Sequence, residues 1–204
     1  MQERAIRTRQ QILTAATVEF SQKGLHGARV DEIAKRAKVN KERIYAYFGS
    51  KEQLFRETLR EAIAEIIAEE QTLLTHLAED PTRMTEVTLE HYLGFLERHP
   101  HFWRLLAWEN LSGGAEAEAL SGVREQTFKE MRQLYQQRQK LGMFSKAISF
   151  EAFIFTLSAV SFFLFSNRLT MERTLQLNLA TPATRQQLMA EVLTLIQHGQ
   201  IPHC

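Results

Sequence analysis

The sequence predicts an all-α protein. An N-terminal three-helix head with a helix-turn-helix is joined by a long helix to a second, helical body. Apolar residues recur at helical spacing in every segment, and no segment shows the alternation of a strand. Proline, glycine and asparagine separate the segments. Two short helical patterns near the N-terminus are separated by only enough residues for one tight turn, which indicates a DNA-binding motif.

The composition is that of an ordered globular chain of one large domain or two unequal ones. Of the 204 residues, 44% are hydrophobic and 24% are charged, and a chain of this length can bury a substantial core. The single cysteine, Cys204, excludes an intrachain disulfide and a cysteine-only metal site. The N-terminus has no apolar run of the kind that forms a signal peptide, so we expect a cytoplasmic protein.

The first 60 residues are basic and the remainder is acidic. They carry 13 Lys/Arg against 7 Asp/Glu, a charge of +6, which leaves −5 for the rest of a chain with net charge +1. A basic module of this kind is expected to neutralise DNA phosphates, with an affinity that falls as salt rises. A solvated charged face would explain the same charge, and only the coincidence with the two-helix pattern favours DNA.

Three helices fit before residue 50. The first is predicted over about 4–23 and ends at Gly24 and Gly27, which supply the positive φ values of a helix end and a turn. The second buries one apolar face made of Val30, Ile33, Ala34 and Ala37. Asn40 caps the third, because its side-chain oxygen accepts a backbone hydrogen bond of the first turn, and Ile44 and Phe48 face inward.

A long helix follows. Ser50 and Gln53 form a capping box at its start, and the Asp80-Pro81 pair ends it after about 28 residues, or roughly 40 Å. Further helices are predicted over 82–98, 102–111, 116–140, 150–169 and 185–198.

Two of these segments are unusually apolar. The segment 102–111 is apolar nearly all round, so we expect it to be enclosed. The segment 152–165 has no charged residue for 14 positions, yet it is shorter than the roughly 20 residues of a membrane span. We therefore expect this helix to pack against its own domain on one side and a partner chain on the other.

Over about 7–59 the sequence resembles the TetR family of bacterial transcriptional regulators. The order of motifs carries the resemblance, as follows: Phe20-Ser21-Gln22-Lys23-Gly24-Leu25-His26-Gly27, Val30-Asp31-Glu32-Ile33-Ala34, Val39-Asn40-Lys41, Ile44-Tyr45-Ala46-Tyr47-Phe48 and Ser50-Lys51-Glu52. Beyond about residue 62 the chain resembles the family only in its all-helical layout and in the region 99–114.

The resemblance implies a DNA-binding domain over 1–50 and a ligand-binding and dimerisation domain over 51–204. It implies a homodimer formed through helices at about 150–169 and 185–198. On the recognition helix it places four residues near base edges, namely Lys41, Glu42, Arg43 and Tyr45. It places Tyr47 and Lys51 at phosphates, where Lys51 is reinforced by the positive N-terminus of the long helix.

The sequence departs from the family at several positions. Ala28 and Arg29 stand where small hydroxyl residues open the second helix, so a hydroxyl cap is lost, although Arg29 could hold a phosphate by charge. Lys38 occupies a turn position where glycine is frequent and must adopt a strained backbone or a different turn. Glu42 and Arg43 replace small residues, and Arg43 favours guanine whereas Glu42 accepts from cytosine or repels phosphate. Tyr45 could instead cover the edge of the core.

These observations lead to the hypothesis of a dimeric repressor that a small hydrophobic or amphipathic molecule releases from a palindromic operator. The ligand would bind in the second domain, shift the long helix and change the distance between the two heads. Its predicted contacts are aromatic side chains and three polar ones, namely Tyr92, Trp103, Trp108, Phe128 and Tyr135 with His91, Glu109 and Asn110. Plain core packing would also explain each single aromatic residue, because helical spacing places core and pocket residues on the same face.

Other classes of function remain open. A DNA-associated structural or protein-interaction factor could use the same head without any inducer. For an enzyme the sequence offers no phosphate-binding loop, nucleophile elbow or His-Glu-x-x-His motif. His99 and His101 flank Pro100 at a spacing that does not place two metal ligands on one helical face. We therefore expect no catalytic residues, no metal and no cofactor.

Overall fold

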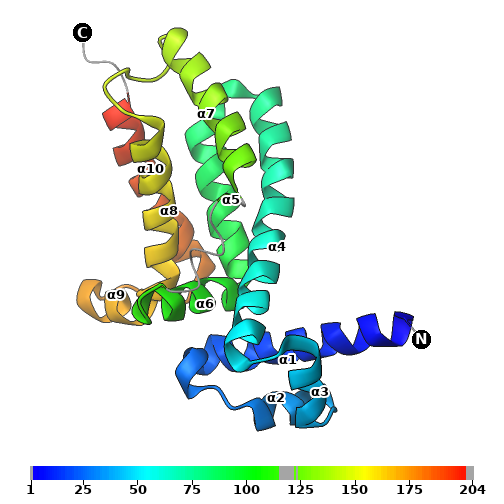
Figure 1. Cartoon of the computed structure of the whole chain (residues 1–204). Coiled ribbons are helices and arrows are strands. Elements are labelled where there is room, and N and C mark those ends of the chain that lie inside the picture. Colours follow the sequence, from blue (N-terminus) through cyan, green and yellow to red (C-terminus); the bar gives the residue numbers. More distant parts are fainter. Residues whose placement is uncertain (1, 115–121, 123, 201–204) are drawn as a thin grey trace. The chain divides into compact units, whose positions relative to one another are not determined.

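The computed structural model describes residues 2–114, 122 and 124–200, and within these every regular element is a helix, as predicted (Figure 1). The helices are α1 Gln2–Gly27, α2 Val30–Ala37, α3 Lys41–Phe48, α4 Lys51–Glu79, α5 Met84–Arg98, α6 Pro100–Leu111, α7 Glu125–Lys140, α8 Phe150–Ser166, α9 Arg168–Leu175 and α10 Pro182–Gln200, with a 3-10 turn at Pro81–Arg83.

The contacts divide the chain into two compact units. The first contains the described residues up to Ile66 together with those from His99 to Gly114, and the second contains Ile67–Arg98 together with the described residues from Arg124 onward. Helix α4 contributes residues to both. This division concerns contacts alone, and the functional boundary at residue 50 stays a prediction.

In the first unit α1 packs against α2 and α6, and α2 packs against α3. Phe20 of α1 meets Phe55 of α4 edge to face at 5.0 Å between ring centroids. All the residues that the sequence placed on the inner faces of the two short helices are buried, which confirms their helical register. This core leaves the opposite faces of α2 and α3 open to a partner.

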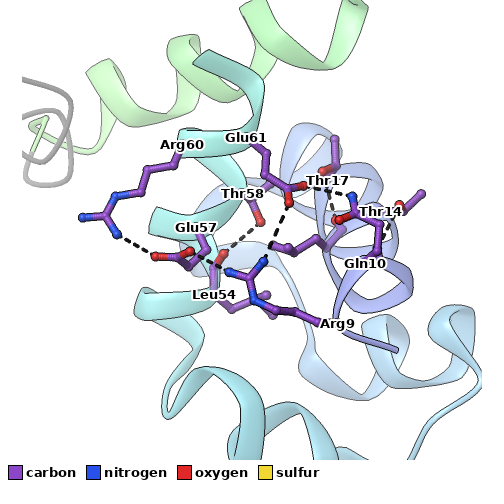
Figure 2. Close-up of polar contacts among 10 residues, drawn as sticks. Arg9, Gln10, Thr14, Thr17, Leu54, Glu57, Thr58, Arg60 and Glu61 are labelled. Atoms are coloured by element: carbon purple, nitrogen blue, oxygen red, sulfur yellow. Dashed lines mark hydrogen bonds and ion pairs between the residues drawn. The ribbon is translucent and has the colours of Figure 1, made fainter. Parts of the chain in front are cut away.

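Ion pairs and hydrogen bonds fasten α1 to the first turns of α4 (Figure 2). Arg9 reaches Glu57 at 2.8 Å and Glu61 at 3.9 Å, and Gln10 donates to Glu61 at 3.3 Å. The guanidinium of Arg9 also lies over the ring of Phe48, 5.3 Å from its centroid. One arginine thereby links α1 to the last turn of α3 and to the beginning of the long helix.

The helix ends follow the predicted caps. The side chain of Asn40 accepts from the amide of Arg43 at 3.0 Å, and that of Ser50 accepts from the amide of Gln53 at 3.1 Å. Lys38 takes the left-handed conformation, with φ 55°. Helix α1 does not end at Gly24 but bends there, at φ 66°, and continues to Gly27.

The second unit is built around α5, which packs against α8 and α10. Its core cluster is formed by Leu73, Leu74, Leu77, Met84, Leu89, Tyr92, Met131, Tyr135, Phe144, Phe150, Phe153 and Leu157. Arg138 is 1% exposed, and its guanidinium donates to the backbone carbonyls of Leu134 and Leu77 at 2.8 and 2.9 Å. These bonds to carbonyl oxygens allow a cation to be buried in an apolar core.

Several predicted helix boundaries are wrong. The helix predicted over 150–169 breaks after Ser166, and α8 and α9 meet at 84°. Asn167 donates to the hydroxyl of Ser166 at 2.9 Å, and both residue types favour helix ends because their side chains compete for local hydrogen bonds. Two helices begin earlier than predicted, at Pro100 and Pro182, because proline suits the first turn of a helix.

The helix predicted over 116–140 is described from Glu125, and residues 115–121 and 123 lie outside the described residues. The expected enclosure of 102–111 is only partial, since Trp108 is 36% and Leu111 80% exposed. Among the described residues no single helix is long and apolar enough to cross a membrane, and only the bent pair of α8 and α9 meets the length and composition criteria together.

Candidate DNA interface and ligand residues

The outer face of α3 carries the predicted DNA-contacting residues. Ile44 and Phe48 are buried, whereas Glu42, Arg43 and Tyr45 are exposed. Tyr45 is 41% exposed, so its ring does not serve mainly as core packing. A short helix with one apolar and one polar face, set at a tight turn against α2, is the geometry that enters a major groove.

Four predicted contacts surround one shallow hollow between α2, α3 and the start of α4. The hollow has a volume of about 400 Å³ and is lined by Ala28, Arg29, Val30, Asp31, Lys41, Tyr45, Gly49, Ser50, Lys51 and Glu52. Glu42, Arg43 and Tyr47 line a separate hollow along α3. The structure therefore brings together Arg29, Lys41, Tyr45 and Lys51 and places the other three predicted contacts apart from them.

Two cations of the first hollow already have partners inside the protein. The Lys41 ammonium lies 3.0 Å from a carboxylate oxygen of Asp31, and this hydrogen bond raises the pKa of Lys41. The Lys51 ammonium donates to the carbonyl oxygen of Ala28 at 3.2 Å. Both side chains are thereby oriented before any phosphate arrives, and the carboxylate of Asp31 competes with DNA for Lys41.

The start of α2 is held by a residue that the sequence did not single out. Arg29 makes no side-chain cap, as expected from the missing hydroxyl. Glu19 of α1, only 2% exposed, accepts from the backbone amide of Arg29 at 3.3 Å and from Lys23 at 2.7 Å. Burial acts to raise the pKa of this carboxyl, but the bonds from Lys23 and Arg29 outweigh it and the pKa is lowered. Glu19 therefore stays charged and fixes the loop that leads into α2.

The predicted ligand contacts fall into two groups. Trp103, Trp108, Glu109 and Asn110 lie on α6 in the first unit, whereas His91, Tyr92, Phe128 and Tyr135 lie in the second. In the first group Trp108 packs over Gly24, where an added Cβ would lie 2.8 Å from the indole. The glycine therefore serves both the bend and this close approach.

In the second group the two tyrosines differ. The Tyr135 hydroxyl donates to the carbonyl of Ile148 at 3.1 Å, and its ring packs against Phe144 and Phe153 at 5.0 and 4.9 Å between centroids. These contacts favour core packing for Tyr135. The hydroxyl of Tyr92 is buried without a hydrogen bond of ordinary geometry.

The two histidines considered as metal ligands have other contacts. The ring of His99 lies 3.1 Å from Glu65, and that of His101 lies 2.9 Å from the hydroxyl of Ser21. Across the described part of the chain no group of three or more potential ligands gathers. Cys204 lies outside the described residues.

Comparison with known proteins agrees with this geometry. The family described as "Bacterial regulatory proteins, tetR family" matches residues 12–58, and the one described as "Tetracyclin repressor-like, C-terminal domain" matches 81–196. The chain is 33% identical to the HTH-type transcriptional repressor NicS of Pseudomonas putida over 95% of this chain and 91% of that protein. It is 30% identical to the repressor SCO4008 of Streptomyces coelicolor over 76% of each.

Among solved structures, the fatty acid degradation regulator FadR from Bacillus halodurans superposes with a TM-score of 0.69 at 18% identity, covering 93% of this chain and 94% of that one. At this identity the likeness establishes the fold alone. The family matches span both the helix-turn-helix and most of the second unit, and NicS aligns along nearly the whole chain. The protein therefore belongs to the TetR family and is a DNA-binding transcriptional regulator.

Proposed function

We propose that the protein is a homodimeric cytoplasmic repressor that binds a palindromic operator through α3 and leaves it when a small molecule binds. The polar outer face of α3, supported by a buried apolar inner face, is the observation that carries this proposal. The relatives NicS and SCO4008 are both named as repressors, which supports repression over activation.

On the operator, Lys41, Glu42, Arg43 and Tyr45 contact base edges, and Arg29, Tyr47 and Lys51 contact phosphates. Arg43 can donate two hydrogen bonds to guanine in the major groove. Lys51 and the first turn of α4, capped by Ser50, together offer an ammonium and a positive helix end to one phosphate. Base contacts set the sequence that is bound and phosphate contacts set the salt dependence.

Dimerisation through α8 and α10 explains their outward apolar residues. One face of α8 is buried within its own unit, with Phe153, Leu157 and Leu164 inward, while Phe155 is 73% exposed. Leu195 of α10 is also 73% exposed. Pairing of such faces with those of a second copy removes them from water, as in obligate interfaces. A dimer presents two recognition helices to two half-sites.

Release requires that the ligand bind better to the protein off the DNA than on it. Helix α4 contributes residues to both units and begins directly after the DNA-binding helix, so a shift along it reaches α3. Arg9 and Gln10 tie α1 to Glu57 and Glu61 of the same helix, which makes the head follow α4. Ligand contacts are expected within the second unit, from His91, Tyr92 and Phe128.

The test is selection of genomic DNA fragments by the purified protein, followed by measurement of operator affinity by fluorescence anisotropy. Palindromic sites are expected, with Arg43→Ala and Tyr45→Ala each weakening binding on the order of tenfold or more per half-site contact. Lys129→Ala, which removes an exposed charge from α7, serves as the control and is expected to have little effect.

Retention of DNA without sequence preference would contradict the proposal. It would instead favour a DNA-associated structural factor.

A further inference from the structure

One face of α5 buries three polar atoms that make no hydrogen bond of ordinary geometry to any residue that the structure describes. They are Oγ1 of Thr88, Nε2 of His91 and the hydroxyl of Tyr92. Thr88 is 0% and Tyr92 5% exposed. The three positions are spaced i, i+3 and i+4, so they share one side of the helix, and the rings of His91 and Tyr92 lie 5.8 Å apart. Buried polar groups nearly always have partners, so three on one helical face need an explanation.

A buried ion pair lies beside this face. Glu70 of α4 is 0% exposed, and the guanidinium of Arg124 donates to both of its carboxylate oxygens. The pair is close enough to act on Tyr92. Burial raises the pKa of Tyr92 most and Glu70 raises it further, whereas the charge of Arg124 and a weak hydrogen bond with its guanidinium lower it. Because the two charges cancel, the surroundings of the α5 face carry donors and acceptors but no net charge.

The remaining neighbours are aromatic or flexible. The guanidinium of Arg124 also lies 4.5 Å from the centroid of Phe128, and Phe128 meets Phe150 edge to face at 6.4 Å. Tyr92 and Phe150 belong to the same core cluster as Met131. Met131 is unbranched, so it can adapt to a ring inserted beside it. Polar atoms next to aromatic rings suit a flat ligand with polar substituents on one edge.

We propose that Thr88, His91 and Tyr92 form the polar recognition edge for an uncharged aromatic ligand that carries a hydrogen-bond donor beside an acceptor. This inference rests on the proposed ligand-responsive function. A ligand carboxylate would meet the buried charge of Glu70, and a ligand ammonium would meet that of Arg124, so both charged classes are disfavoured. A neutral ligand with two adjacent polar atoms can form hydrogen bonds with the two hydroxyls and the imidazole. It does so without separating Glu70 from Arg124.

The imidazole fits this role. Burial lowers the pKa of His91, so the ring is uncharged at neutral pH and presents either a donor or an acceptor at Nε2. Four nearby charged or titratable groups act on the pKa of His91. Glu69 raises it, whereas Arg98, His76 and Arg124 lower it. The ligand edge can therefore be matched by either tautomer.

The experiment compares four probes of similar size, namely 2-pyridone, benzoate, benzylamine and toluene, by ligand-observed NMR titration of the full-length protein. We expect 2-pyridone to bind at least about tenfold more tightly than the two charged probes. Thr88→Val and Tyr92→Phe keep the shape and remove one hydroxyl each. Each is expected to weaken 2-pyridone binding about tenfold, to leave toluene binding unchanged and not to lower the melting temperature.

Tyr135→Phe is the matched control, because its hydroxyl already donates to Ile148. This variant should lower the melting temperature and leave the affinity for 2-pyridone unchanged. Tighter binding of benzoate or benzylamine than of 2-pyridone would overturn the inference. So would a lower melting temperature with unchanged 2-pyridone affinity in Thr88→Val and Tyr92→Phe, because the hydroxyls would then serve the fold.

Operator affinity, measured separately on the same samples, distinguishes the two proposals. If 2-pyridone binds as expected but no ligand weakens operator binding, the release mechanism fails and the site stands. If operator binding responds to a charged compound that does not need Thr88 or Tyr92, the release mechanism stands and the site fails.

Discussion

The DNA-binding head and the α5 region of the second unit differ in whether their buried polar side chains have hydrogen-bond partners. In the described residues of α1, α2 and α3 every buried side-chain oxygen and nitrogen has a partner, and even the carboxylate of Glu19 is satisfied by Lys23 and Arg29. On α5 the buried polar atoms of Thr88, His91 and Tyr92 have no hydrogen bond of ordinary geometry to a described residue. The buried polar groups of the head are therefore satisfied within the protein, whereas these three groups of α5 lack such partners among the described residues.

The outer surfaces differ in the same sense. The head presents charged and tyrosine side chains that water solvates well. Its outer surface is therefore stable without DNA or a second chain. Helices α8 and α10 present Phe155, Phe163 and Leu195 to water, which costs free energy until another apolar surface covers them. We therefore expect the second unit to depend on partners for its stability and the head to be stable without them.

The largest effect is expected from Phe155→Glu. If the exposed ring of Phe155 lies in the dimer interface, a carboxylate there is buried without a partner and is repeated by symmetry in the second copy. The dimer dissociation constant should rise at least about 100-fold, or about 3 kcal/mol. Analytical ultracentrifugation measures it, and operator affinity should fall in parallel.

Lys129→Glu is the control, since it introduces the same residue at an exposed position of α7. A Phe155→Glu protein that remains dimeric at nanomolar concentration would remove α8 from the interface.

Arg124→Ala should destabilise the second unit by about 2–3 kcal/mol at neutral pH, because it leaves the fully buried carboxylate of Glu70 without its cation. Burial already raises the pKa of Glu70, and loss of the guanidinium raises it further. The folded state then holds the proton more tightly than the unfolded state. The penalty should therefore be small below the ordinary pKa of 4.5 and grow as the pH rises above it.

Urea unfolding at pH 5 and at pH 7.5 measures this difference. Arg132→Ala, in the helix α7 that Arg124 precedes, removes an exposed pair with Glu151 and a contact over the ring of Phe150 but leaves no buried charge unpaired. It should therefore destabilise much less, and equally at both pH values. An equal loss in both variants would mean that helix α7, rather than the buried pair, is responsible.

The sequence also predicts the structure of the head better than that of the second unit. In the head, the caps of Asn40 and Ser50 follow from local rules, and the inner faces of α2 and α3 were predicted correctly. The predicted end of the first helix at Gly24 was wrong, because α1 bends there and continues to Gly27. Local patterns could not indicate the role of Glu19. Its carboxylate accepts a hydrogen bond from an amide ten residues away, and by sequence alone such a glutamate is indistinguishable from surface charge on an amphipathic helix.

In the second unit the sequence predicted helices but not their breaks or their buried polar groups. The long apolar run over 150–169 concealed the bend at Asn167, because hydrophobicity continues on both sides of it. Thr88, Glu70 and Arg124 were not singled out, since a threonine, a glutamate and an arginine on helices are ordinarily solvated. Their roles depend on packing between α4, α5 and α7, which helical periodicity does not encode.

A smaller effect is expected from Asp31→Asn in the head. The Asp31 carboxylate holds the Lys41 ammonium at 3.0 Å and adds a negative charge to the hollow where phosphate is expected. The amide should release Lys41 and raise operator affinity about threefold to tenfold at low salt, with the gain shrinking as salt increases. Anisotropy titrations across a salt series measure it.

Glu79→Gln, which removes the same charge from an exposed position at the end of α4, should change affinity much less. Equal gains in both variants would point to overall charge rather than to the contact with Lys41.

The smallest effect compares the same backbone geometry in both regions. Lys38 in the head and Gln176 in the second unit each end a short helix in the left-handed conformation, with φ 55° in both. Glycine relieves the strain of a side chain there but enlarges the entropy of the unfolded chain, so Lys38→Gly and Gln176→Gly should each stabilise by about 0.5–1 kcal/mol. Urea midpoints measure this. Equal gains in stability would show that such turns obey local rules wherever they occur. A gain at Gln176 alone would mean that the side chain of Lys38 stabilises the head enough to offset its backbone strain, as expected for a surface that is stable without DNA.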